Sequence, residues 1–226
     1  MVTAPSPAGS NVNFGRKKNS NEAAAAKIIR VQHRGIFCAL EAIAMEELAR
    51  HYLDEVRRQF RGHKRMVEGA IAQVSDEEFF RALDAEANSI AVIMKHLGGN
   101  LRSRFSDFLN TDGEKADRRR DEEFVMDRHT RREQVMEGWE KGWAVLSEAL
   151  ASLTPEDIQK KVNIRAQPHT VLQALNRQVA HCAYHAGQIV FLAKHFRGAE
   201  WKSLSIARGR SDEFNAEMEK KFRQQD

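Results

Sequence analysis

Apolar residues recur three or four positions apart along four long stretches of the chain. This spacing places the apolar side chains on one face of an α-helix, which needs a partner surface to bury them. No stretch shows a convincing strand pattern. The sequence therefore predicts an all-α protein, and four amphipathic helices of this length favour a four-helix bundle. The stretches are residues 46–74, 88–110, 130–153 and 170–196.

Helix boundaries are predicted from residues that commonly cap helices. Asn88 can cap the second helix, and the runs that begin at Thr130 and Thr170 have the form of capping boxes, with Glu or Gln three residues on. Thr154-Pro155 favours a new turn, because proline suits a first helical position. Gly198 is placed to end the last helix.

Composition divides the chain into three parts. Residues 1–44 are predicted to form a disordered or poorly ordered extension, because the first 21 are rich in Ser, Asn, Gly and Pro and Gly35 interrupts the weak pattern that follows. A clean amphipathic pattern begins at Met45, which resembles a natural start of translation. We expect the helical domain at 45–215 and a C-terminal tail at 216–226.

Composition and charge also narrow the class of protein. Of the 226 residues, 42% are hydrophobic and 30% are charged, the balance of a globular domain. No apolar run approaches the roughly 20 residues of a membrane span, and no secretory signal opens the chain. The first 65 residues hold 12 basic and 6 acidic residues, so the body is nearly neutral, which does not favour nucleic-acid binding. Cys38 and Cys182 alone make no disulfide framework, and a cytoplasmic location is expected.

Two histidines on the predicted last helix are the strongest chemical signal. His181 and His185 lie four residues apart, so both imidazoles leave one face, with Cβ atoms about 5–6 Å apart. Neutral imidazoles at that separation can bind one divalent cation. His96 lies on the flank of the second apolar stripe, so the three histidines can converge inside a bundle. The alternative interpretation is a histidine-lined core without a metal.

The residue directly after the first of the paired histidines argues against one enzyme class. Cys182 stands where the HExxH metalloproteases have glutamate, so a zincin peptidase is not expected. Cys182 also lies about 100° around the helix from His181, and we expect a small core residue rather than a ligand or nucleophile. The other histidines have no partner at a useful spacing, and His195 suits a helix C-terminus.

Six short motifs occur along the helical domain in a characteristic order. They are Asn88-Ser89-Ile90-Ala91, His96-Leu97-Gly98-Gly99-Asn100, Gly113-Glu114-Lys115, Trp139-Glu140-Lys141-Gly142-Trp143, His181-Cys182-Ala183-Tyr184-His185-Ala186-Gly187-Gln188-Ile189 and Trp201-Lys202-Ser203-Leu204-Ser205-Ile206. Together they resemble the DinB/YfiT superfamily, in particular its branch of domains of unknown function. The resemblance spans about residues 45–215.

This resemblance implies a four-helix bundle that binds a divalent metal, commonly nickel or zinc, through one histidine of the second helix and a pair on the last. The ligands here would be His96, His181 and His185, a donor set that also suits copper. The resemblance further implies a metal-dependent transferase with a low-molecular-weight thiol as cosubstrate, and a metal-dependent hydrolase is the alternative. Gln188 and Asn100 are candidates to orient a ligand or a bound water.

Arginines near the predicted site have two interpretations. Arg102 and Arg104, or the loop Arg118-Arg119-Arg120, can hold an anionic cosubstrate. Alternatively, acidic neighbours in the charged connection 111–128 pair with them, with little net energy. Those neighbours are Asp117, Asp121, Glu122 and Glu123.

A function of another class is also open. The protein can be a stress-linked bundle whose metal is structural and which acts through a partner surface. Bundles of this kind often pair through helix faces, so a homodimer is one expectation, although nothing in the sequence identifies the surface. The substrate, the catalytic residues and the metal identity follow from no motif in the chain.

Overall fold

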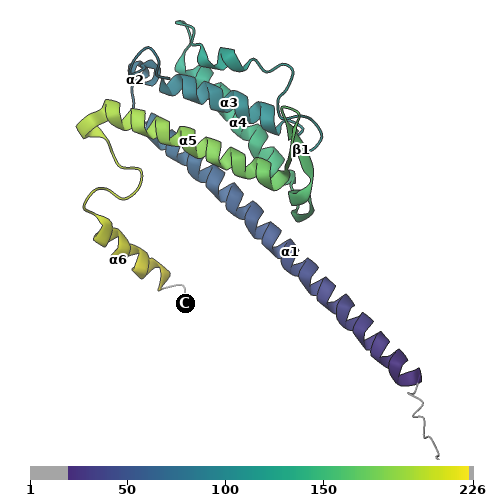
Figure 1. The fold of residues 1–226 in the computed structure, drawn as a ribbon. Helices are drawn as coiled ribbons and strands as arrows, with labels where there is room; N and C mark the ends of the chain where they lie inside the picture. The colour runs from purple at the N-terminus through teal and green to yellow at the C-terminus, as the bar shows by residue number, and fades with distance from the viewer. Residues whose placement is uncertain (1–19, 224–226) are drawn as a thin grey trace, which may run out of the picture. The chain divides into compact units, whose positions relative to one another are not determined.

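The computed structural model describes the backbone of residues 20–223 and the side chains of residues 41–223 (Figure 1). The longest helices are α1 (Ser20–Ile71), α3 (Ile90–Phe105), α4 (Arg132–Ser152) and α5 (Val171–Arg197). Shorter elements are α2 (Asp76–Phe80), α6 (Ser211–Phe222) and the 3-10 turns η1 (Arg120–Phe124), η2 (Pro155–Gln159) and η3 (Gly198–Glu200). Strands β1 (Lys161–Ile164) and β2 (Gln167–Thr170) pair antiparallel. The described residues are therefore mostly helical, which confirms the predicted all-α class.

The helix α1 begins at Ser20, well before Glu46, where the amphipathic pattern starts. Residues 23–26 are all alanine, the residue with the highest helix propensity, so a helix can form there without an apolar stripe. The chain separates between Met45 and Glu46 into two units, and the second contains the candidate site. Residues 1–19 of the predicted extension and 224–226 of the predicted tail lie outside the described residues.

The sequence pattern predicts no strand, and the hairpin of β1 and β2 corrects that expectation. Its turn residues Arg165 and Ala166 have φ values of 55° and 61°, a backbone region that usually favours Asn or Gly. The Asp112 carboxylate accepts both backbone N–H groups, at 2.8 and 2.7 Å, and so stabilises the turn from another segment. Because the usual turn residues are missing, the hairpin has no local sequence signal.

Three of the predicted helix boundaries are confirmed. Thr154 caps η2, with Pro155 in its first turn. Thr170 caps α5 with a reciprocal pair of hydrogen bonds to Gln173, at 2.9 and 3.1 Å. Gly198 ends α5 with φ of 52°, in the left-handed region that glycine adopts without strain.

Two helices begin one residue later than predicted. α3 starts after Ser89 rather than Asn88, because the Ser89 hydroxyl accepts a backbone N–H of the first turn. α4 starts after Arg131 rather than Thr130, and a glutamine side chain of the first turn accepts the Arg131 N–H. α3 also ends before Asn110, since the chain turns at Asp107, whose φ is 47°.

A single apolar core contains side chains from α1, α3, α4 and α5. On α1, Phe60 packs edge-on against Trp143 of α4, with ring centroids 6.3 Å apart, and Tyr52 donates to Asn176 of α5 at 2.8 Å. Residues 46–71 of α1 therefore pack against both α4 and α5. Among the described residues, no helix is both long and apolar enough to cross a membrane.

Glycines bring α3 and α4 unusually close. A Cβ atom added to Gly142 would lie 2.5 Å from the Gly98 carbonyl oxygen, and one added to Gly98 would lie 2.7 Å from the Gly138 carbonyl oxygen. Both obstacles are backbone atoms, so they cannot move aside as a side chain can. This contact fixes the position of α3, the helix that carries the first histidine of the candidate site.

Candidate metal centre

Three histidines from two helices converge at the edge of the core. His96 comes from α3, and His181 and His185 lie one turn apart on α5. Their candidate ligand nitrogens all lie within 4.8 Å of one another. His96 is buried, whereas His181 and His185 are partly exposed. The three side chains can therefore hold one metal ion, and they are the three that the sequence pattern singles out.

The imidazole Nδ1 atoms lie beside groups that orient the rings. His96 Nδ1 lies 2.8 Å from a carboxylate oxygen of Glu123, and His185 Nδ1 lies 2.7 Å from the amide oxygen of Gln188. Donation from Nδ1–H to these oxygens leaves the lone pair on Nε2, the atom of His96 that faces His181.

Gln178 is the neighbour of the third ring, and sequence reasoning missed it. Its amide nitrogen lies 3.4 Å from His181 Nδ1 and 3.5 Å from the Cys182 sulfur. Turning the amide over presents its oxygen to Nδ1–H, because the two ends of the amide are interchangeable in shape. Gln178 precedes His181 by one turn, so helical spacing was the only signal that could have found it.

The spacing of the Nε2 atoms matches a shared cation. The Nε2 atoms of His96 and His181 are 3.3 Å apart. Two nitrogens that each lie 2.0–2.1 Å from a tetrahedral zinc ion are separated by about 3.3 Å. Two lone pairs facing each other at this distance repel unless a proton or a cation lies between them. Three histidine ligands would also leave one coordination position open.

Electrostatics keep the paired imidazoles neutral near pH 7. Burial, followed by the positive charge that His185 and His96 would carry, lowers the pKa of His181 to about 3. Burial also lowers the pKa of His185, although its hydrogen bond with Gln188 opposes that shift. Neutral imidazoles are the form that binds metals, so these two rings need not lose a proton before a metal binds.

Glu123 and Arg118 form a buried ion pair behind His96. Arg118 donates to both Glu123 oxygens, each at 2.9 Å, and its side chain is 2% exposed. Burial alone would raise the pKa of Glu123, but hydrogen bonds from His96 and Arg118 outweigh it and the pKa is lowered. A charged carboxylate therefore holds the His96 ring. An added Cβ on Gly99 would overlap this carboxylate, which explains the small residue there.

The remaining predicted residues lie in different surroundings. Asn100 and Arg104, on α3, are 6% and 7% exposed. Arg102 is exposed on the same helix and pairs with Asp117 at 3.2 Å. Gln188 contacts His185, as described above. The structure therefore brings Asn100 and Arg104 into the interior and leaves Arg102 at the surface.

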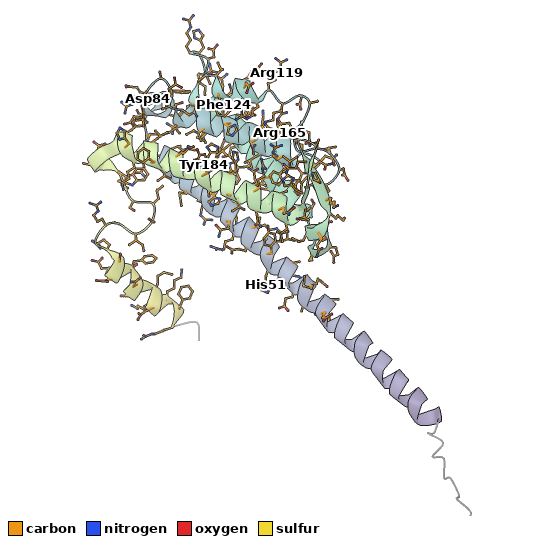
Figure 2. All side chains as sticks on the ribbon, in the orientation of Figure 1. His51, Asp84, Arg119, Phe124, Arg165 and Tyr184 are labelled. Carbon is orange, nitrogen blue, oxygen red and sulfur yellow. The ribbon has the colours of Figure 1, made fainter. Side chains whose placement is uncertain are left out.

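The arginine loop is paired with acidic residues throughout. Arg119 pairs with Glu122 at 3.0 Å and Arg120 with Asp121 at 3.4 Å, both at the surface. Figure 2 shows Arg119 on the outer side of this loop. Arg118 alone turns inward. The pairing interpretation is thus correct for the loop, although the Arg118 pair is buried rather than superficial.

Aromatic rings flank the histidines. The ring centroids of Phe124 and His96 are 4.7 Å apart, and those of Tyr184 and His185 are 4.9 Å apart. Figure 2 shows Phe124 beside α3 and Tyr184 on α5. Tyr184 is exposed whereas His96 is buried.

Fold and site together define a helical protein with a three-histidine centre between two of its longest helices. The family described as "Protein of unknown function (DUF1572)" matches residues 47–210, most of the chain, and the protein belongs to this family. The match covers both helices that supply the histidines. Neither the curated proteins nor the solved structures include a match to this chain.

Proposed function

We propose that this protein binds one divalent metal ion, zinc or nickel, through His96, His181 and His185. The observation that carries the proposal is the 3.3 Å separation of two Nε2 atoms, which is the spacing of nitrogen ligands on a tetrahedral ion. Glu123 and Gln188 support it, since metal-binding histidines commonly donate their second N–H to such groups. The shared core of four long helices and the order of the motifs support a DinB/YfiT-like four-helix bundle.

We further propose that the protein is a transferase that uses a low-molecular-weight thiol. A divalent ion on three neutral nitrogens keeps its full charge and stabilises a thiolate, the reactive form of the thiol. A cosubstrate would supply the thiol, since Cys182 is buried in the core and burial raises its pKa to about 12. In the transfer, a sulfur–carbon bond forms as the bond to the leaving group breaks, and the thiol proton passes to solvent.

A structural metal without catalysis is the second candidate. The buried chain from Arg118 through Glu123 to His96 favours it, because this chain ties the connection after α3 to the metal centre. A metal there would stabilise the fold by linking that connection and α3 to α5. The two candidates share the ligands and differ only in whether the open position reacts.

Metal content tests the shared part of the proposal. Protein purified without a polyhistidine tag should contain about one zinc or nickel ion per chain by elemental analysis. His181→Ala should lose the ion, because two ligands bind far more weakly than three. His195→Ala is the matched control on the same helix, since that side chain is exposed and lies outside the cluster. Equal metal content in both variants would rule out the proposed ligands.

Thiol consumption separates the two candidates. The metal-loaded protein should accelerate conjugation of a small thiol with a haloarene, and chelation or His181→Ala should remove the acceleration. Acceleration that survives in His181→Ala would refute the transferase. A large fall in melting temperature on chelation, with no acceleration by the loaded protein, would identify the metal as structural.

A further inference from the structure

A row of buried polar side chains continues from the histidines along α3. His96, Asn100 and Arg104 are spaced four residues apart, so they lie on one face of the helix. Their exposed fractions are 5%, 6% and 7%. His96 contacts α5 through His181 and His185, so the row begins beside α5, and Arg104 at its other end lies beside Glu114. Three buried polar residues in one row are costly unless each finds a partner.

Two polar atoms toward the Arg104 end of this row lack hydrogen-bond partners. Among the described residues, Asn100 Oδ1 and Arg104 Nη1 are buried polar atoms with no hydrogen-bond partner. Arg104 Nη1 does lie 3.1 Å from a carboxylate oxygen of Glu114, but without the geometry of a hydrogen bond. A buried polar atom without a hydrogen bond lowers the stability of the fold. Two such groups in succession point to a ligand that satisfies them.

Arg104 shares its carboxylate partner with other arginines. Arg104, Arg118 and Arg165 all approach the same oxygen of Glu114, at 3.1, 3.2 and 3.2 Å. Burial lowers the pKa of Arg104, Glu114 opposes the shift, and the neighbouring guanidinium groups, including that of Arg177 on α5, lower the pKa further. Arg118 also pairs with Glu123, and although burial raises the pKa of the nearby Asp112 carboxyl, backbone hydrogen bonds and the charge of Arg104 lower it. Arg104 itself shares the Glu114 oxygen with two other guanidinium groups, so an anionic ligand can complete its hydrogen bonds.

We infer that Asn100 and Arg104 form an anion-recognition subsite for a ligand whose other end binds the metal held by the three histidines. Residues eight apart are separated by about 12 Å along a helix axis. The ligand is therefore elongated, with a metal-binding group at one end and a carboxylate or similar anion at the other. Asn100 would accept a hydrogen bond from an N–H or O–H in its middle. This inference rests on the proposed metal site and names the class of thiol that the site takes.

A matched pair of thiols tests the subsite. Mercaptohexanoate and mercaptohexanol have the same chain length and differ in the terminal carboxylate. Their affinity for untagged, cobalt-loaded protein can be measured from the cobalt–thiolate absorption. A hydrogen-bonded charge pair contributes about 1.5–3 kcal/mol, so mercaptohexanoate should bind at least about tenfold more tightly. Arg104→Gln should abolish this preference.

Two further variants keep the test decisive. Arg102→Gln removes an exposed guanidinium two residues away, paired with Asp117, and should retain the preference. Glu114→Gln removes the carboxylate that competes for Arg104 and should strengthen mercaptohexanoate binding, a gain that a damaged fold would not produce. Equal binding of the two thiols, or a preference that survives Arg104→Gln, would overturn the subsite and leave the metal site intact. Failure of both thiols to bind would instead refute the proposed function.

Discussion

The helix α3 buries two faces by opposite means. Toward α4 it presents Gly98, which lets the two backbones touch, with apolar side chains around the contact. Its other face carries the buried polar residues His96, Asn100 and Arg104, of which His96 contacts α5. The first interface gains dispersion energy from close packing. The second leaves buried polar atoms without partners, which lowers the stability of the fold.

This contrast separates residues that stabilise the fold from buried polar residues that lower its stability. A protein can keep an unfavourable polar interface only if its other interfaces supply enough stability. The glycine contact keeps α3 in place, and so keeps His96 opposite His181 and His185. Substitutions at the two faces should therefore have opposite consequences, for folding on one face and for binding on the other.

Gly142→Ala should give the largest effect. The new Cβ would lie 2.5 Å from the Gly98 carbonyl oxygen and 2.8 Å from its Cα, so α3 and α4 must separate. Overpacking of this kind costs about 1–3 kcal/mol, or more where only backbone can move. We expect a loss at the upper end of that range, or failure to fold, measured by urea unfolding.

Gly138→Ala is the matched control, one turn away on α4. A Cβ there meets no atom within 4 Å, and alanine favours a helix by up to about 1 kcal/mol over glycine. This variant should be neutral or stabilised. Similar losses in the two variants would show that the close contact between α3 and α4 does not determine stability.

Glu123→Gln should lower the affinity for the metal and leave the packing of the core unchanged. The amide keeps the shape of the carboxylate but removes the charge that holds the His96 ring and pairs with Arg118. Loss of such a partner typically lowers metal affinity 10–100-fold, which competition with a chromophoric chelator can measure. Glu122→Gln is the control, since its carboxylate pairs with Arg119 at the surface. Equal affinities would remove Glu123 from the metal centre.

Asn100→Leu should stabilise the metal-free protein. Leucine has a similar branched shape and removes a buried oxygen that has no partner, so a gain of about 1 kcal/mol is expected. Ser103→Ala, on the same helix, should have the opposite sign, because Ser103 donates to the Gly113 carbonyl and accepts the Lys115 N–H. A destabilised Asn100→Leu protein would contradict the view that this face carries unsatisfied groups.

Periodic features of the chain predict the parts that depend on helical geometry alone. The spacing of His181 and His185 places both on one face, and the stripe on the second helix places His96 opposite them. The caps at Thr154 and Thr170 follow from contacts within a few residues. Only His96 has a distant partner, 85 residues on, and the two helices meet because their apolar stripes share one core.

The features that sequence reasoning missed depend on partners far along the chain. Three acidic residues follow one another at 121–123, and no local signal distinguishes Glu123, which turns inward, from Glu122, which stays exposed. The hairpin turn at Arg165 is stabilised by Asp112, 53 residues away. Arg102 and Arg104 look equivalent in sequence, and only the direction of each on α3 separates the surface residue from the buried one.

The smallest expected effect is on the pH dependence of stability, at His63 of α1. Its Nδ1 atom is buried without a hydrogen-bond partner among the described residues, and burial lowers its pKa below the ordinary value of 6.5. The pKa of His181 is also lowered, to about 3. Its effect on the pH dependence of stability should be the same in the wild type and in a His63 variant. Comparison of the two therefore isolates His63.

As pH falls through 6.5, the unfolded chain takes up a proton at His63 before the folded protein does. The contribution of His63 to stability is thus fully present above pH 6.5 and declines as the solution is acidified below it. His63→Gln, neutral at every pH, should lose less stability than the wild type between about pH 7.5 and 5.5. The difference should be small, because His63 is partly exposed, and urea midpoints in metal-free buffer would measure it. Parallel losses would mean that the His63 ring is as well solvated in the folded protein as in the unfolded chain, unlike the histidines between α3 and α5.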